Sequence, residues 1–248
     1  MLIPKFVLGI VIGASNSGKT NCIRNLLLQP NEQWLDYNRV YIFRTSLEQL
    51  KYRIIIKSFQ SNLTKEDIIK IFYHQNYIKR EKVDVFEHIE EAAKDVVNSD
   101  HEVETFIFEK SDDVRDPRTL DKQKNNLMIF DDLMMETNQN MCESYYTRRR
   151  HNNCDCFYLA QNYAEIPRHA IRVNCNFIIA FPQDDNDKRS IWKSFASTHM
   201  DFDEFKHFCN HVWKENYNFV TIDTTRTPTD GRYRNGLYDF YTPAKFVH

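Results

Sequence analysis

One stretch near the start of the chain constrains the fold more than any other. An apolar run of strand length, residues 6–12, leads directly into Gly13-Ala-Ser-Asn-Ser-Gly-Lys-Thr20, which fits the pattern G-x-x-x-x-G-K-[ST]. In such a loop the two glycines let the backbone curl, so that successive N–H groups point at a polyphosphate and the next helix directs its positive end there. The chain has only 5 glycines and places two of them here. The stretch therefore predicts a strand, a phosphate-binding loop and a helix.

Each position of this loop has an expected role. Lys19 would neutralise the β and γ phosphates of a nucleoside triphosphate, and the Thr20 hydroxyl would bind the Mg²⁺ that bridges them. A nucleoside triphosphate and Mg²⁺ are therefore the expected cofactors. An ordinary Gly-rich turn is the alternative interpretation. The residues predicted to bind nucleotide are Gly13, Ser15, Asn16, Ser17, Gly18, Lys19 and Thr20.

Length and composition favour a single domain over residues 1–248, with residues 223–248 as a C-terminal extension packed on it or projecting from it. The formal charge of −2 argues against a uniformly basic DNA-coating protein, so any contact with DNA phosphates must be local. The six cysteines include no C-x-x-C pair and are expected to be reduced and buried. No run reaches the roughly 18 apolar residues of a membrane span, so an intracellular protein without such a span is expected.

The periodicity of the chain predicts an α/β fold: a largely parallel central sheet of at least five strands, flanked by helices. Thr64 and Asp67 form a helix-start signal before one of the helices. The expected helices cover 21–28, 68–73, 83–97, 138–150, 184–195 and 201–213. The expected strands cover 6–12, 39–43, 104–109, 126–130, 156–160, 176–181 and, as the last core strand, 218–222.

A second informative stretch is Asn126-Leu-Met-Ile-Phe-Asp-Asp-Leu133, a buried strand that ends in paired carboxylates. Ligands bind at the carboxyl ends of strands in open α/β sheets. We therefore expect Asp131 to anchor Mg²⁺, directly or through an intervening group, and Asp132 to polarise the attacking water as a general base. The alternative is a common strand-to-turn transition.

Gln161 ends a further predicted strand, 156–160. The interval from Asp131 to Gln161 suits one crossover helix, which would bring Gln161 to the same sheet edge as the two carboxylates. A polar side chain there can touch the γ-phosphate or the water. A solvated glutamine at a strand end is the alternative.

Taken together, these motifs resemble those of the poxvirus-type viral genome-packaging ATPases, a branch of the FtsK–HerA superfamily found in large DNA viruses, virophages and Polinton-like elements. The resemblance runs from about Phe6 to Tyr241. The chain departs from the family pattern at Arg149, where such proteins often carry glycine, and at Asp132, where the wider superfamily usually has Glu. The blocks that carry the resemblance are Gly13 to Thr20, Ile129-Phe-Asp-Asp132, Tyr146-Thr-Arg-Arg-Arg150-His151-Asn152, Tyr158-Leu-Ala-Gln161-Asn162, Ile166-Pro-Arg168, Ile171-Arg172 and Gly231-Arg-Tyr-Arg234.

The resemblance implies a P-loop NTPase fold of the ASCE type and an ATPase that moves double-stranded DNA into a preformed capsid. Its implied partners are the DNA backbone, a capsid or portal-like vertex, and further copies of the chain in a pentameric or hexameric ring. Its implied location is the host cytoplasm or virus factory, and association with the virion is a further expectation. Gln161 would be the sensor of the γ-phosphate by this resemblance.

Arg150 is our choice for an arginine finger, because it stands at a helix end near an expected subunit boundary, from which a guanidinium could reach a neighbour's phosphate. The rivals are Arg148, Arg149, Arg168 and Arg172. Residues 148–151 could instead stabilise a helix C-terminus, which favours cations.

Candidate DNA contacts are weak, since charged segments are more often simply solvated. They are Lys79-Arg80, Lys188-Arg189, and Arg226 through Arg234 with Tyr233.

Two other functions remain open. The first is a small nucleotide or nucleoside kinase, but in such kinases the acidic strand normally follows the phosphate loop after a much shorter interval. The second is a nucleotide-dependent switch without turnover, but such a switch gains nothing from a positioned base.

Overall fold

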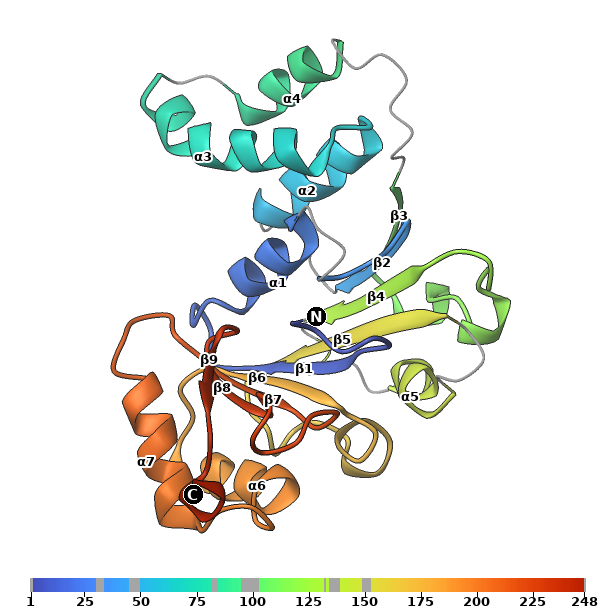
Figure 1. Ribbon diagram of the computed structural model, residues 1–248. Coiled ribbons are helices and arrows are strands. Elements are labelled where there is room, and N and C mark those ends of the chain that lie inside the picture. The colour runs from blue at the N-terminus through green and yellow to red at the C-terminus, as the bar shows by residue number, and fades with distance from the viewer. Residues whose placement is uncertain are drawn as a thin grey trace.

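The computed structural model describes residues 2–29, 34–44, 50–81, 84–94, 103–131, 133, 139–148 and 153–247, with the backbone alone for 74–81. Within these ranges the chain forms one nine-stranded sheet in the order β3-β2-β4-β5-β1-β6-β7-β8-β9 (Figure 1). The parallel strands are β1 (Leu8–Ile12), β2 (Arg39–Arg44), β3 (Glu104–Phe108), β4 (Asn126–Asp131), β5 (Cys154–Ala160) and β6 (Phe177–Ala180). The antiparallel strands are β7 (Val220–Asp223), β8 (Tyr233–Asn235) and β9 (Asp239–Tyr241).

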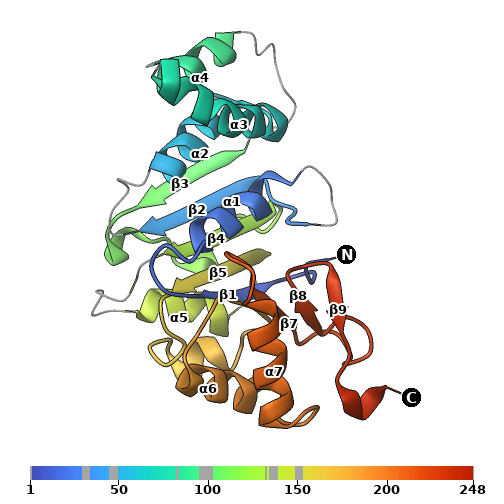
Figure 2. The ribbon, with the colours of Figure 1, turned by 90° about the vertical axis from the view of Figure 1, so that its left-hand side faces the viewer.

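Helices cover both faces of this sheet, as Figures 1 and 2 show. On one side lies α1 (Lys19–Leu28), with α2 (Leu50–Gln60), α3 (Lys65–Glu81) and α4 (Val85–Lys94) stacked outward from it. On the other side lie α5 (Asn140–Thr147), the π-helical turn η5 (Arg168–Arg172), α6 (Asp185–Phe195) and α7 (Phe202–Val212).

Two hydrophobic cores result, because neighbouring residues of a strand point to opposite faces. Val11 and Ile129 pack with α1 to α4, whereas Ile10 and Phe130 pack with α5 to α7. Strands buried on both faces need nearly continuous apolar runs, which explains why β1, β4 and β5 were visible in the sequence.

The predicted fold class is confirmed: a mixed α/β protein with a mostly parallel sheet between helices. The helix-start signal is also confirmed, since the Asp67 backbone N–H donates to Thr64 Oγ1 (3.2 Å) at the start of α3. Two features were missed. Helix α2 contains three consecutive isoleucines, a β-rich pattern, and β8 and β9 have only 3 residues each, too few for a periodicity.

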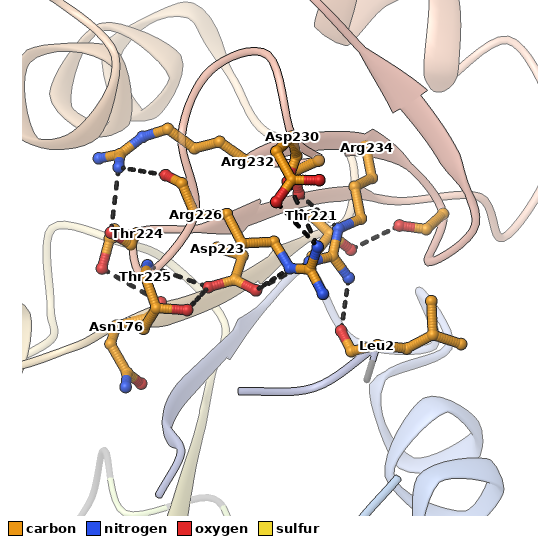
Figure 3. Close-up of polar contacts among 12 residues, drawn as sticks. Leu2, Asn176, Thr221, Asp223, Thr224, Thr225, Arg226, Asp230, Arg232 and Arg234 are labelled. Carbon is orange, nitrogen blue, oxygen red and sulfur yellow. Dashed lines mark hydrogen bonds and ion pairs between the residues drawn. The ribbon is translucent and has the colours of Figure 1, made fainter. Parts of the chain in front are cut away.

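A buried ion pair links the segment after β7 to the end of that strand (Figure 3). Arg234 on β8 is fully buried, and its Nη2 lies 2.8 Å from Asp223 Oδ2 at the end of β7. The guanidinium also donates to the backbone carbonyls of Gly231 (2.7 Å) and Leu2. Strands β8 and β9, which belong to the expected C-terminal extension, continue the same sheet, because β8 pairs with β7 and β9 pairs with β8.

All six cysteines are free and buried, as the sequence predicted. Burial raises the pKa of the Cys22 and Cys175 thiols to about 12, so both stay protonated at neutral pH. Among the described helices, none combines the length and the apolar character that crossing a bilayer requires.

Candidate active site

The loop between β1 and α1 has the geometry that a phosphate cradle needs. Asn16 has a positive φ of 62° and Gly18 a φ of 115°, and the Ser17 N–H donates to Ala14 O (3.1 Å). A Cβ on Gly13 would lie 2.5 Å from Ser17 Oγ and 2.6 Å from Phe181 Cβ. Glycine is therefore required at 18 by the backbone conformation and at 13 by close packing. The curl brings the first turn of α1 to the mouth of the loop.

Lys19 lies across this mouth. Its ammonium donates to the carbonyl oxygens of Gly13 and Ala14, the latter at 3.0 Å. Together with the amino end of α1, it supplies positive charge where an anion would enter. This arrangement suits binding of a polyphosphate.

Asp131 ends β4, on the other side of β5 from the loop strand. It is only 5% exposed, and its Oδ2 lies 2.8 Å from Nη1 of Arg44, which is 6% exposed and ends the neighbouring strand β2. The register places Arg44 directly opposite Asp131. A carboxylate this deeply buried requires a compensating charge, and Arg44 provides one.

Tyr52 on α2 connects Asp131 to the phosphate loop. The side chain is fully buried, its ring lies 5.1 Å from the Arg44 guanidinium, and its hydroxyl lies near both Asp131 and Thr20. Burial raises the pKa of Tyr52 well above the usual value, and the negative charge of Asp131 raises it further. The hydroxyl is thus protonated, yet it makes no hydrogen bond of good geometry to a described residue.

Gln161 follows β5, the strand between β1 and β4. Ala160 pairs with Ile12, the Gly13 N–H donates to Ala160 O (3.2 Å), and Leu159 pairs with Asp131. The register therefore places Gln161, which is partly exposed, between the loop and the end of β4.

Thr20 and Asp131 fit the expected magnesium site by the chemistry of their donors. The described residues contain no group of three or more His, Cys, Asp or Glu side chains able to hold a metal by themselves. Mg²⁺ usually binds through one or two protein oxygens and takes its other ligands from phosphate and water. One hydroxyl and one carboxylate near the same tyrosine hydroxyl match that requirement.

Several predicted residues lie outside the described ranges. These are Asp132, the expected general base; Arg150, the expected finger; and Arg149, one of its rivals. The side chains of Lys79 and Arg80 lie outside them as well. Their roles stay predictions.

Three of the candidate DNA contacts are buried. Tyr233 and Arg234 are completely inaccessible, and Lys188 is 7% exposed, with its ammonium 2.7 Å from Asp185. Treating these three as surface charges or rings was wrong. Inside the fold, the Tyr233 hydroxyl donates to the Phe195 carbonyl and Arg234 pairs with Asp223, while the buried Lys188 side chain donates to the exposed Asn210. Arg189, which packs over the Phe202 ring at 4.0 Å, is exposed.

The other arginines named for DNA or for the finger differ in exposure. Arg226 pairs with Asp223 and Asp230 at 3.3 and 3.6 Å. Arg172 is partly buried over the Tyr163 ring at 5.0 Å. Arg148 and Arg168 are exposed.

Sequence reasoning missed three residues near the site. Arg44 had a signal, since a basic residue at the carboxyl end of a predicted strand belongs to the same edge as Asp131. Tyr52 had none, because its helix was not predicted. Tyr217, between α7 and β7, is 71% exposed with a φ of 64°, and its Cδ1 would lie 3.7 Å from a Cβ on Gly18.

Comparison with known proteins is informative only at the level of structure. No protein-family model matches the chain, and no curated protein matches it either. The genome packaging NTPase B204 from Sulfolobus turreted icosahedral virus 2 is structurally similar. In complex with ATP-gammaS it aligns with a TM-score of 0.51 and 11% identity, over 90% of this chain and 95% of that chain. In complex with sulfate it aligns with a TM-score of 0.51 and 11% identity, over 97% of this chain and 100% of that chain. At this identity the likeness shows the fold alone, that of a P-loop NTPase.

Proposed function

We propose that this protein is an ATP-driven translocase that packages viral double-stranded DNA into a capsid. The observation that supports it best is the strand order: β5, with Gln161 at its end, lies between the strand of the phosphate loop and the strand of Asp131. An extra strand at this position is typical of motor ATPases. A small kinase of the alternative class would have its acidic strand next to the loop strand. The structural neighbour's name, a genome packaging NTPase solved with ATP-gammaS, supports the same class.

Each site residue then has a separate role in ATP hydrolysis. Lys19 binds the β and γ phosphates, and Thr20 and Asp131 hold Mg²⁺, which neutralises charge on the phosphates when bound. Asp132 polarises the attacking water for in-line displacement. Gln161 contacts the water or the γ-phosphate and so reports the nucleotide state. Arg150 reaches the phosphate of a neighbouring subunit.

The proposed assembly is a homo-oligomeric ring of five or six subunits around DNA, docked on a capsid or portal-like vertex. DNA would be gripped through its backbone without sequence preference. The proposed place of action is the host cytoplasm or virus factory, and the protein is also proposed to associate with the virion.

The test is the rate of phosphate release from ATP with and without double-stranded DNA. We expect DNA to stimulate turnover, and Lys19→Ala to abolish it. Lys70→Ala is the matched control, because Lys70 is exposed on α3 in a surface pair with Asp67 and lies outside the site. Transfer of phosphate to a small acceptor would instead show a kinase, and nucleotide binding without turnover a switch. A Lys19→Ala rate within a few-fold of the native rate would refute the site.

The finger is tested separately by mixing subunits. Arg150→Ala should bind ATP and lose hydrolysis, and mixing it with Asp132→Ala subunits should restore part of the activity if the arginine acts across a boundary. Arg148→Ala and Arg168→Ala serve as comparisons, since both side chains are exposed. No restoration in the mixture would place the role of Arg150 within one chain.

A further inference from the structure

The buried pair of Arg44 and Asp131 lies at the point where the proposed metal site must form. The two residues end adjacent parallel strands, and their side chains are 8% and 7% exposed, with 2.8 Å between Nη1 and Oδ2. An arginine guanidinium carries a full positive charge, so Asp131 already has a cationic partner. Any cation that binds Asp131 must therefore compete with a guanidinium already bound to it.

Tyr52 fixes the guanidinium in this position. Its ring lies 5.1 Å from the centre of the Arg44 guanidinium, close enough for a cation–π contact in a buried setting. Its hydroxyl lies near Asp131 and Thr20 without a well-formed hydrogen bond to a described residue. A buried hydroxyl without such a bond costs free energy, and a hydrated cation held by Thr20 and Asp131 would offer this hydroxyl a hydrogen-bond partner. The hydroxyl is an observation independent of the ion pair, and it points to the same place.

We propose that Arg44 is the resident counter-charge of Asp131 and sets the affinity of the site for divalent metal. In the absence of nucleotide the guanidinium holds the carboxylate, so free Mg²⁺ binds weakly. When a triphosphate supplies further anionic ligands for Mg²⁺, the Arg44 guanidinium would release Asp131 or share it with the cation. This inference rests on the proposed function, because it takes Thr20 and Asp131 as the metal site.

A purely structural role for Arg44 makes a different prediction. If the arginine only neutralised a buried carboxylate, its removal would lower stability, and the affinity for metal would stay unchanged. If it competes with metal, its removal takes away the positive charge 2.8 Å from Asp131, and metal binds this carboxylate more tightly. The affinity of the nucleotide-free protein for metal therefore separates the two roles.

The experiment measures binding of Mn²⁺, as a paramagnetic substitute for Mg²⁺, to the nucleotide-free full chain by electron paramagnetic resonance. We expect Arg44→Met to bind Mn²⁺ about tenfold more tightly or better than the native protein, because one nearby unit charge has been removed. Arg44→Gln, which keeps a hydrogen-bond donor for Asp131 and loses the charge, carries the same prediction if the methionine variant fails to fold. The gain should vanish when Asp131→Asn is added.

Arg39→Met is the matched control. Arg39 begins the same strand and is also in ion pairs, with Glu104 at 3.0 Å and Asp121 at 3.4 Å, but it stands at the opposite end of β2. Its replacement should leave Mn²⁺ affinity within twofold of native.

The outcomes separate this inference from the proposed function. In one outcome, the native protein binds Mn²⁺ together with ATP-gammaS, but both Arg44 variants bind free Mn²⁺ as weakly as the native protein does. Arg44 then does not compete with metal, so this inference is wrong while the proposed function stands. If the native protein binds no Mn²⁺ with ATP-gammaS, or Asp131→Asn leaves that binding unchanged, both the site and the inference fall.

Discussion

Arg234→Met tests whether the C-terminal strands are held by the buried ion pair. The change removes a guanidinium that is fully buried and replaces it with an unbranched apolar chain, which fills part of the same space. Asp223, also fully buried, loses its 2.8 Å partner, and the carbonyls of Leu2 and Gly231 lose a donor (Figure 3).

The size of the loss follows from what Asp223 keeps. Its Oδ1 still accepts from the Thr225 N–H at 3.0 Å and hydroxyl at 2.6 Å, and Arg226 Nε remains 3.3 Å from Oδ2. The broken buried pair should therefore cost about 3 kcal/mol, the low end of its range, and the two carbonyls should add about 1 kcal/mol together. We expect a loss of about 4 kcal/mol in the free energy of unfolding, or roughly 8–16 °C in Tm for a chain of this size.

The measurement is equilibrium unfolding in urea, followed by far-UV circular dichroism and by the fluorescence of the tryptophans. Arg226→Met is the matched control: its side chain is 24% exposed, so we expect a loss of about 1 kcal/mol or less. Adding Asp223→Asn to Arg234→Met should cost much less than the sum of the single changes, because no unpaired charge is left. A loss below about 1 kcal/mol for Arg234→Met, or strict additivity in the double variant, would refute the reasoning.

Three further predictions concern the site and the pH dependence of stability. Tyr217→Ala should weaken ATP binding about tenfold and leave binding of tripolyphosphate unchanged, because a base could stack on this exposed ring beside Gly18. Equal losses for both ligands, or the same loss of ATP binding in the control Tyr73→Ala, whose side chain is also exposed, would contradict this prediction. Gln161→Ala should keep ATP affinity in a fluorescence titration and lower kcat about 100-fold, and an unchanged kcat would remove the sensor role. Burial, then Arg232 and Lys245, lower the pKa of His199 in the folded protein, so its contribution to stability is complete above the unfolded value of about 6.5 and is lost as pH falls from there through the lower pKa of the folded state. His199→Gln should reduce the loss of urea stability between about pH 7.5 and 5.5, and an identical loss in both proteins would contradict this assignment.

The sequence by itself determined the elements whose signals are local. The loop from Gly13 to Thr20 needs its glycines and its lysine at fixed spacing, and the strand before Asp131 needs a continuous apolar run, so both could be recognised without a partner. The position of Gln161 followed from one more step, since parallel strands joined by a single helix end at the same edge. These signals were sufficient for the α/β fold class and for the central part of the candidate site.

Only the tertiary structure decided which charges meet. Arg44 and Asp131 are 87 positions apart, and they form a pair because β2 and β4 align in one register. Arg234 was expected as a charge available to DNA, but β8 joins the sheet and buries it against Asp223. A charged side chain looks the same in the sequence whether it faces water or a buried partner. Its environment is set by long-range strand pairing, and the residue types on its own segment do not specify that pairing.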